Sequence, residues 1–176
     1  MARRTLRALD NRIIKRTLIS GAKNGICNIS TKEIASLLGI TEPTIYVHYK
    51  TKENLLFCAY KEAVEDILKV NHSLLDDLEK TEKSEEDIRK FLDALVKLDG
   101  IEKEKIAYAI DYERNTKEIA HPLCDAFYDR LFTVLSANKE QISAFRYVLK
   151  AIRENAIKEK HEMPSSTYEA LLVFLK

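Results

Sequence analysis

The sequence contains few of the residues that interrupt helices or form tight turns. Its 176 residues include only 4 glycines and 3 prolines, and no tryptophan. Because glycine and proline mark the turns between short strands, their scarcity favours long helices over a sheet with many hairpins. Hydrophobic residues make up 45% of the chain and charged residues 32%, a balance typical of a folded globular protein rather than a disordered one.

Cysteines and long apolar runs are also scarce. The 3 cysteines, Cys27, Cys58 and Cys124, form no CxxC pair, and their odd number is typical of thiols in a reducing compartment. No apolar run approaches the roughly 20 residues that span a bilayer, and no signal-peptide pattern follows Met1. We therefore expect a cytoplasmic protein that does not contact a membrane.

The motifs of common catalytic and metal sites are missing as well. The sequence has no glycine-rich phosphate loop, no nucleophile elbow and no histidine and cysteine cluster with metal-ligand spacing. The histidines are scattered along the chain, at His48, His72, His121 and His161. The sequence thus predicts a protein that is not an enzyme and that has no cofactor and no metal site.

Charge is distributed unevenly along the chain. Residues 1–52 contain 10 lysines and arginines against 3 acidic residues, whereas residues 53–176 contain 19 against 25. A basic N-terminal third joined to an acidic remainder is the pattern expected when only one end of a protein meets a polyanion. Six of the basic residues lie before residue 17, so a chance cluster is the alternative interpretation.

Two short predicted helices follow a first helix over residues 10–24. Ser30 and Glu33, in the sequence STKE, form a capping box that opens a helix ending at Gly39. Thr41 offers the next N-cap, and Pro43 lies in the first turn, where its missing N–H costs nothing. Two short helices joined by a tight glycine-containing turn predict a helix-turn-helix.

Helical periodicity continues to the end of the chain. Further helices are expected at about 52–78, 85–98, 102–115, 118–135, 140–160 and 166–175. We therefore predict an all-α fold with two parts. Residues 1–51 would form a small, basic three-helix domain that contains the helix-turn-helix, and residues 52–176 an acidic helical bundle.

The second short helix separates its residues into two faces. On a helical projection of residues 42–49, Ile45 and Tyr49 point toward the preceding helix, and Pro43 and Val47 point toward solvent. An apolar outward face suits the floor of the DNA major groove, where it can meet a thymine methyl group.

The neighbouring side chains supply the other contacts expected at DNA. Hydroxyls, helix N-termini and one lysine would contact phosphates, through Ser30, Thr31, Thr44, Tyr46 and Lys52. Side chains expected at base edges are Lys32, Glu42, Pro43 and Val47, with Glu42 accepting from a cytosine amine, whereas His48 could meet a phosphate. Each has a plain alternative: Tyr46 as a surface tyrosine, Val47 as a dimer contact, His48 as a packing residue, and Glu42 as a residue favoured by the helix dipole.

The stretch STKEIASLLGITEPTIYVHYKTKENLL, residues 30–56, closely resembles the DNA-binding domain of the tetracycline-repressor (TetR) family. The resemblance extends over about residues 10–57, and the Tyr46 position and the Lys-x-Lys-Glu tail distinguish it from a generic helix-turn-helix. Ala22 and Ile29 depart from the family pattern, which usually has a bulky aromatic and a threonine there. The resemblance implies that residues 1–51 are a DNA-binding domain, which meets a double-stranded DNA operator through the contacts named above and with His48 also at a base edge. It implies that residues 52–176 are a variable bundle that takes a small ligand and dimerises through its last two helices.

The C-terminal sequence agrees with a bundle of this kind. Apolar residues expected at a homodimer interface are Ile142, Phe145, Leu149, Ile152, Leu171, Leu172 and Leu175, since the last helix is apolar on more than one side. Candidates for lining a ligand pocket are His72, Phe91, Tyr108, Asp111, Tyr112 and Phe127, although aromatics at helical spacing more often form a core. We predict a ligand-responsive transcriptional regulator, most simply a repressor, that binds a palindromic operator as a dimer. The alternative is a protein of the same fold that acts through a protein partner or without a small-molecule inducer.

Overall fold

All regular structure in the described part of the chain is helical. The computed structural model describes residues 2–97, 101–116, 122–135 and 139–159. Its helices are α1 (Ala2–Asn24), the 3₁₀ helix η1 (Ile26–Asn28), α2 (Thr31–Leu38), α3 (Glu42–Tyr49), α4 (Lys52–Glu79), α5 (Glu85–Lys97), α6 (Lys103–Thr116), α7 (Pro122–Leu135) and α8 (Lys139–Glu159). The predicted all-α fold is confirmed.

Most helix boundaries lie close to the predicted ones, and α1 differs most. It begins at Ala2 rather than at Asp10, because the intervening residues are mainly alanine, arginine and leucine, which favour a helix. The helix expected over 166–175, and the start expected at Glu118, fall outside the described residues.

The chain forms two compact units. Unit 1 is formed by residues 1–64 and 102–119, and unit 2 by residues 65–101 and 120–176. Unit 1 thus contains α1, η1, α2, α3, α6 and the first half of α4. The boundary expected at residue 51 concerns function and stays a prediction. The unexpected member of unit 1 is α6, which lies within the predicted C-terminal bundle by sequence.

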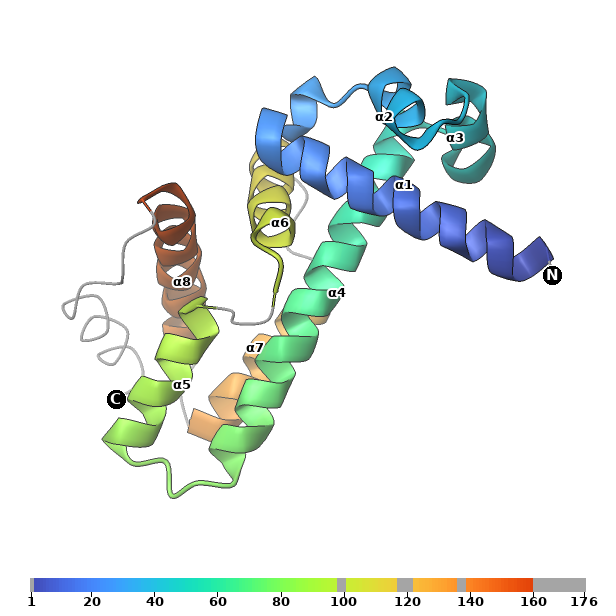
Figure 1. Ribbon diagram of the computed structural model, residues 1–176. Helices are drawn as coiled ribbons and strands as arrows, with labels where there is room; N and C mark the ends of the chain where they lie inside the picture. The colour runs from blue at the N-terminus through green and yellow to red at the C-terminus, as the bar shows by residue number, and fades with distance from the viewer. Residues whose placement is uncertain (1, 98–100, 117–121, 136–138, 160–176) are drawn as a thin grey trace. The chain divides into compact units, whose positions relative to one another are not determined.

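In unit 1, α1 packs against both α2 and α6 (Figure 1). The core is aliphatic where α1 meets α2 and α3, with Ile13, Ile34 and Ile45 each at most 1% exposed. Where α1 meets α6, Tyr108 lies against the backbone of α1 at Gly21. A Cβ atom at position 21 would come within 2.4 Å of the Tyr108 ring, so only glycine allows this approach.

A carboxylate on α6 holds the segment between α1 and α2. Asp111 Oδ2 accepts a hydrogen bond from the backbone N–H of Ile26 at 2.8 Å. Asn115 Nδ2 donates to Asp111 Oδ1 at 3.1 Å and fixes the other oxygen. The chain enters η1 through Gly25, whose φ of 82° and ψ of 148° lie in a region restricted almost entirely to glycine. Asp111 therefore orients the segment that leads to α2.

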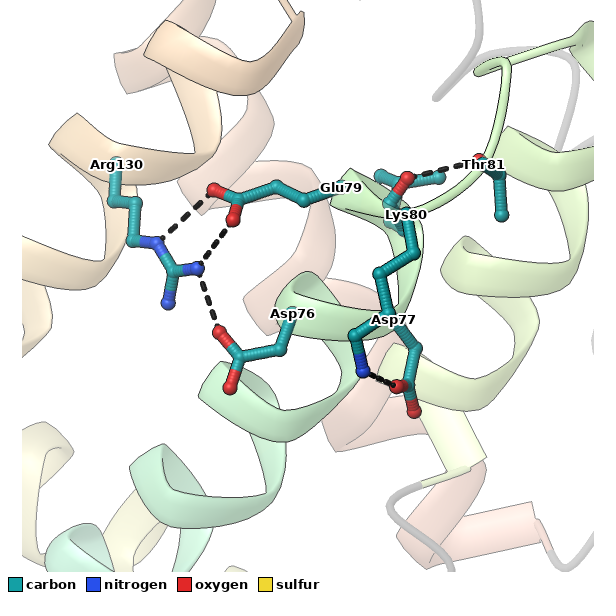
Figure 2. Close-up of polar contacts among 7 residues, drawn as sticks. Asp76, Asp77, Glu79, Lys80, Thr81 and Arg130 are labelled. Carbon is teal, nitrogen blue, oxygen red and sulfur yellow. Dashed lines mark hydrogen bonds and ion pairs between the residues drawn. The ribbon is translucent and has the colours of Figure 1, made fainter.

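Unit 2 contains the second half of α4 with α5, α7 and α8. Phe127 and Phe145 lie in its core, each 0% exposed, and the Phe145 ring meets that of Phe132 edge to face at 6.5 Å. Figure 2 shows Arg130 of α7 reaching two carboxylates near the end of α4. Its guanidinium donates to both oxygens of Glu79, at 3.2 and 2.8 Å, and to Asp76 at 2.6 Å. This bidentate ion pair joins α7 to α4 at the surface of unit 2.

Candidate nucleic-acid interface

The first short helix begins with the predicted cap. Ser30 lies in extended conformation at the N-cap of α2, and its hydroxyl accepts from the Glu33 N–H at 3.2 Å. The helix ends at Gly39, whose φ of 68° and ψ of 30° are left-handed, so the chain turns sharply into α3. The helix-turn-helix expected from these residues is present, with α2 and α3 joined by residues 39–41.

The start of α3 differs in detail from the expectation. Thr41 occupies the N-cap position, and its side chain makes no capping bond to the helix backbone. Its hydroxyl instead lies 2.9 Å from the hydroxyl of Thr44, because both side chains face the same side of this turn. Thr44 is half-buried. Its hydroxyl, which was expected to contact phosphate, thus already takes part in this local bond.

The two faces predicted for α3 are confirmed. Ile45 and Tyr49 are buried, at 0% and 7% exposure, and pack in the core of unit 1. Pro43 is exposed, and Val47 is 69% exposed. An exposed valine beside an exposed proline on a short helix leaves an apolar strip in contact with water.

Side-chain bonds tie α3 to the rest of unit 1 near both of its ends. Near the N-terminal end, Thr31 Oγ1 donates to Glu42 Oε1 at 2.5 Å. At the C-terminal end, His48 Nδ1 lies 2.6 Å from Asp10 Oδ1 of α1, and the Tyr49 hydroxyl donates to the Asp10 carbonyl at 3.3 Å. The exposed strip is therefore presented by a helix that is held at its first and last turns.

These contacts change the interpretation of three residues expected at DNA. Thr31 is 6% exposed, and its hydroxyl faces Glu42 inside the unit. The side chain of His48 is only 11% exposed and is paired with Asp10, which agrees with its alternative interpretation as a packing residue. Glu42 is half-buried, with one carboxylate oxygen held by Thr31.

The link from α3 to α4 passes through a left-handed lysine. Lys50 has φ 65° and ψ −52°, and the Thr51 N–H donates to the Tyr49 carbonyl at 2.7 Å across it. Thr51 then caps α4 by accepting from the Asn54 N–H at 3.0 Å. Lys52 follows in the first turn of α4, half-buried.

Most basic side chains near the N-terminus are exposed. Within residues 7–52, the exposed basic side chains are Arg7, Arg12, Lys15, Arg16, Lys23, Lys32 and Lys50. Lys32 lies in the first turn of α2, next to the cap. Lys15 Nζ forms an ion pair with Glu102 Oε1 at 3.5 Å, and an exposed pair of this kind contributes little to stability. The positive charge predicted for the N-terminal third therefore lies largely at the surface.

Burial controls the protonation of two tyrosines in unit 1. Burial, followed by the nearby charge of Asp10, raises the pKa of Tyr49 well above its usual value. Burial likewise raises the pKa of Tyr108, with smaller contributions from Tyr112 and Asp111. Both hydroxyls stay protonated and act as donors, Tyr49 to Asp10 and Tyr108 to the Leu56 carbonyl at 3.1 Å.

The six residues expected at a ligand pocket are divided between the two units. Tyr108, Asp111 and Tyr112 lie in unit 1, and His72, Phe91 and Phe127 lie in unit 2. In unit 1 the Tyr112 ring stacks on that of Tyr60 at 4.4 Å, while Tyr108 and Asp111 hold α1 and η1. In unit 2 the His72 ring meets Phe127 edge to face at 5.4 Å.

The side chains expected at a dimer interface are placed only in part. Phe145, Leu149 and Ile152 are 0%, 1% and 7% exposed within the single chain, so they pack in the core of unit 2. The Ile142 side chain and residues Leu171, Leu172 and Leu175 lie outside what the structure describes. On the described part of α8, the exposed face carries Ser143, Tyr147 and Ala151, and Tyr147 is 78% exposed.

Two further features are absent from the residues that the structure describes. No helix among them is both long and apolar enough to cross a membrane. No three His, Cys, Asp or Glu side chains in the described ranges are grouped so that they could hold a metal ion.

Sequence reasoning missed the structural roles of Asp10, which holds α3, and of Asp111, which holds η1. Asp10 and Asp111 bond to groups 38 and 85 residues away in the chain. Nothing in the sequence around Lys50 indicates that its backbone φ is positive. The one available signal was the position of Asp10, an acidic residue alone among the six basic residues that precede residue 17.

Comparison with known proteins identifies the N-terminal region. Residues 13–58 match the family model described as bacterial regulatory proteins, tetR family. No curated protein matches the chain in sequence.

Solved structures match the chain over nearly its whole length. A TetR family transcription regulator from Marinobacter aquaeolei VT8 is 15% identical, with a TM-score of 0.66, over 99% of this chain and 96% of that one. A TetR-like transcriptional regulator from Rhodococcus sp. RHA1 is 11% identical, with a TM-score of 0.67, over 94% and 92%. The multidrug binding protein EbrR, complexed with imidazole, is 15% identical, with a TM-score of 0.67, over 94% and 89%. At these identities the structures show a shared fold.

Proposed function

We propose that this chain, a member of the tetR family of bacterial regulatory proteins, regulates transcription by placing the exposed face of α3 in the major groove of double-stranded DNA. The observation that carries the proposal is the apolar strip of Pro43 and Val47, on a helix held at both ends. A helix that reads base edges must keep a fixed orientation to the groove. The bonds from Thr31 and Asp10 supply that orientation within one compact unit.

Base and phosphate contacts come from different side chains in this proposal. Pro43 and Val47 meet base edges, where an apolar atom fits a thymine methyl group. Lys52 and the cap residue Ser30 contact phosphates, since a cation and a helix N-terminus both favour an anion, and Lys32 reaches a base edge. Phosphate contacts fix the protein on the duplex, and base contacts select the sequence.

We further propose that the protein binds a palindromic operator as a homodimer. A dimer with two-fold symmetry presents two recognition helices about one DNA turn apart, or a multiple of it, which a palindromic site matches. The exposed face of α8, with Tyr147 between Ser143 and Ala151, is the described surface that supports a subunit contact. Small residues beside one large aromatic allow two helices to approach closely. The expected contribution of residues 166–175 stays a prediction.

The effector is proposed to be a small, partly apolar molecule that binds among the C-terminal helices and releases DNA, which makes the protein a repressor. EbrR, which shares the fold, is a multidrug binding protein. His72 beside Phe127 offers a polar ring atom next to an aromatic face in unit 2. For release, the effector must prefer the arrangement that does not bind DNA, by about 1–3 kcal/mol for a typical coupling.

Selection from a randomised duplex library, followed by footprinting on the enriched duplex, tests the proposal. Enrichment of one sequence with two-fold symmetry, protected in two major grooves, is the expected result. Failure to enrich any sequence would favour the alternative, a protein of this fold that acts through a protein partner. An enriched sequence without two-fold symmetry would contradict the dimer alone.

A further inference from the structure

Three oxygen-bearing side chains form a continuous hydrogen-bond chain between α2 and α3. Thr31 Oγ1 donates to Glu42 Oε1 at 2.5 Å and lies 3.2 Å from the hydroxyl oxygen of Tyr46. A hydroxyl has one hydrogen to donate. Because Thr31 gives its hydrogen to Glu42, its oxygen must accept from Tyr46. The chain therefore runs from the Tyr46 hydroxyl to Thr31 and from Thr31 to the Glu42 carboxylate.

The direction of this chain limits what Tyr46 can do at DNA. Its hydrogen points toward Thr31, which is 6% exposed, so its hydroxyl oxygen is left only as an acceptor. Phosphate oxygens are acceptors too, and two acceptors do not bond. Tyr46, expected from the sequence to grip phosphate, instead stabilises Thr31 while the chain is intact.

The same direction fixes the Glu42 carboxylate at the start of α3. Glu42 precedes Pro43 on the helix and is half-buried, with Oε1 held by Thr31. A carboxylate only accepts hydrogen bonds. Guanine and thymine present acceptors in the major groove at these positions, whereas cytosine N4 and adenine N6 present amines. A phosphate would repel the carboxylate, so an exocyclic amine is the DNA group that it can bind.

We propose that Glu42 reads the exocyclic amine of one base in each half-site, and that Thr31 is the residue that positions its carboxylate. Tyr46 supports Thr31 by donating a hydrogen bond to the Thr31 hydroxyl oxygen. This inference rests on the proposed function, DNA binding through α3. It makes Glu42 a determinant of specificity by exclusion as well as by contact, since a guanine or thymine edge there would face an oxygen that cannot donate.

The test is duplex selection with the full chain, in parallel for the wild type and four variants. Glu42→Gln adds a donor, so its enriched sequence should accept guanine or thymine at one symmetric position where the wild type requires cytosine or adenine. Thr31→Val, which keeps the shape and removes the hydroxyl, should relax the same position and lower operator affinity more than affinity for scrambled duplex. Thr31→Ser should restore the wild-type preference. Glu33→Gln removes the same charge from an exposed side chain of α2 and should leave the base preference unchanged.

Base analogues then identify the amine. Replacing the selected base by its analogue without the amine, purine for adenine or 2-pyrimidinone for cytosine, should weaken wild-type binding about tenfold, the scale of a good base contact. The same replacement should have little effect on Glu42→Gln.

Several results would overturn the inference, and they differ from failure of the proposed function. An unchanged preference in Glu42→Gln, or equal losses for operator and scrambled duplex in Thr31→Val with an unchanged preference, would contradict it while DNA reading stands. Wild-type enrichment of guanine or thymine opposite Glu42 would do the same. A wild type that enriches nothing would remove the proposed function, and the inference with it.

Discussion

Asp10 contacts α3 with two different groups. Its carboxylate lies 2.6 Å from Nδ1 of His48, and its backbone carbonyl accepts from the Tyr49 hydroxyl. The His48 side chain is 11% exposed and that of Asp10 41%, so water screens the carboxylate in part. The contribution of this pair is therefore that of a partly shielded hydrogen bond rather than of a fully buried ion pair.

A double-mutant cycle of Asp10→Ala and His48→Ala should show a coupling free energy of about 0.5–1.5 kcal/mol, the range of a net hydrogen bond. Urea unfolding of the four proteins measures it. The matched control is the Asp77 and Lys80 pair, whose side chains are 71% and 72% exposed and which should show a coupling near zero. Equal coupling in the two cycles would mean that the Asp10 contact does not hold α3.

Lys50 carries backbone strain next to α3. Its φ of 65° and ψ of −52°, with the bond from Thr51 N–H to the Tyr49 carbonyl, match the rare and strained γ-turn. A sparsely populated conformation of this kind costs an L-residue about 1–3 kcal/mol and glycine much less. We expect Lys50→Gly to be more stable than Lys50→Ala by about 1 kcal/mol, after the entropy cost of glycine. Since both variants lose the lysine, thermal unfolding of the pair isolates the strain, and equal stability would show that position 50 is not left-handed.

At the scale of elements, the contact of α1 with α6 depends on one missing side chain. An added Cβ at Gly21 would lie 2.4 and 2.5 Å from two carbons of the Tyr108 ring. Helix propensity alone favours Gly21→Ala by about 1 kcal/mol, whereas a clash of this kind costs typically 1–3 kcal/mol. We expect the clash to outweigh propensity, so that Gly21→Ala lowers the free energy of unfolding.

Chemical unfolding of Gly21→Ala, alone and with Tyr108→Leu, separates the two effects. In the double variant the smaller side chain removes the clash, so the added alanine should cost less than it does beside Tyr108. A single variant more stable than the wild type, as an exposed helix position would give, would contradict the packing of α6 on α1.

The elements themselves could be predicted because local bonds define them. The caps at Ser30 and Thr51 accept from N–H groups three residues later, and such spacing is visible in a sequence. The faces of α3 follow from the position of Ile45 and Val47 on a helical turn. The helix-turn-helix and the two faces of α3 could thus be predicted from local pattern alone.

Long-range partners could not be predicted in the same way. Asp10 and Asp111 accept from donor groups that lie far away in the chain, and no spacing in the sequence indicates which ones. Tyr108 has the helical spacing of a pocket aromatic and of a core aromatic alike. Its side chain is 0% exposed and its hydroxyl donates to the Leu56 carbonyl, so it is a core residue. The Thr31 hydroxyl was expected to face a phosphate. Its orientation depends instead on Glu42, eleven residues later, and no local pattern indicates that contact.

At the scale of the whole molecule, two buried tyrosines make stability sensitive to alkaline pH. Burial raises the pKa of Tyr49 and of Tyr108 above the ordinary value of about 10. Below that pH both tyrosines are protonated whether the chain is folded or unfolded, so their contribution is fully present. Above it only the unfolded chain ionises, and each tyrosine then costs about 1.4 kcal/mol per pH unit.

We therefore expect the free energy of unfolding to fall between about pH 10 and pH 11, more steeply than in Tyr108→Phe. Urea midpoints at several pH values measure the slope. Tyr147→Phe is the control, because that side chain is 78% exposed and lies outside the core. A slope that is the same in the wild type and in Tyr108→Phe would show that Tyr108 ionises as easily in the folded chain as in the unfolded one.

The central claim, that the exposed face of α3 reads bases while Lys52 holds phosphate, is tested by affinity for operator and scrambled duplex at two salt concentrations. Lys52→Ala should weaken binding to both duplexes and reduce the salt slope by about one unit per half-site. Val47→Ala should leave the salt slope unchanged and relax one base pair by about 1 kcal/mol, the value of a lost thymine-methyl contact. Equal losses on both duplexes in the two variants, with both salt slopes at the wild-type value, would contradict the assignment of this face to DNA.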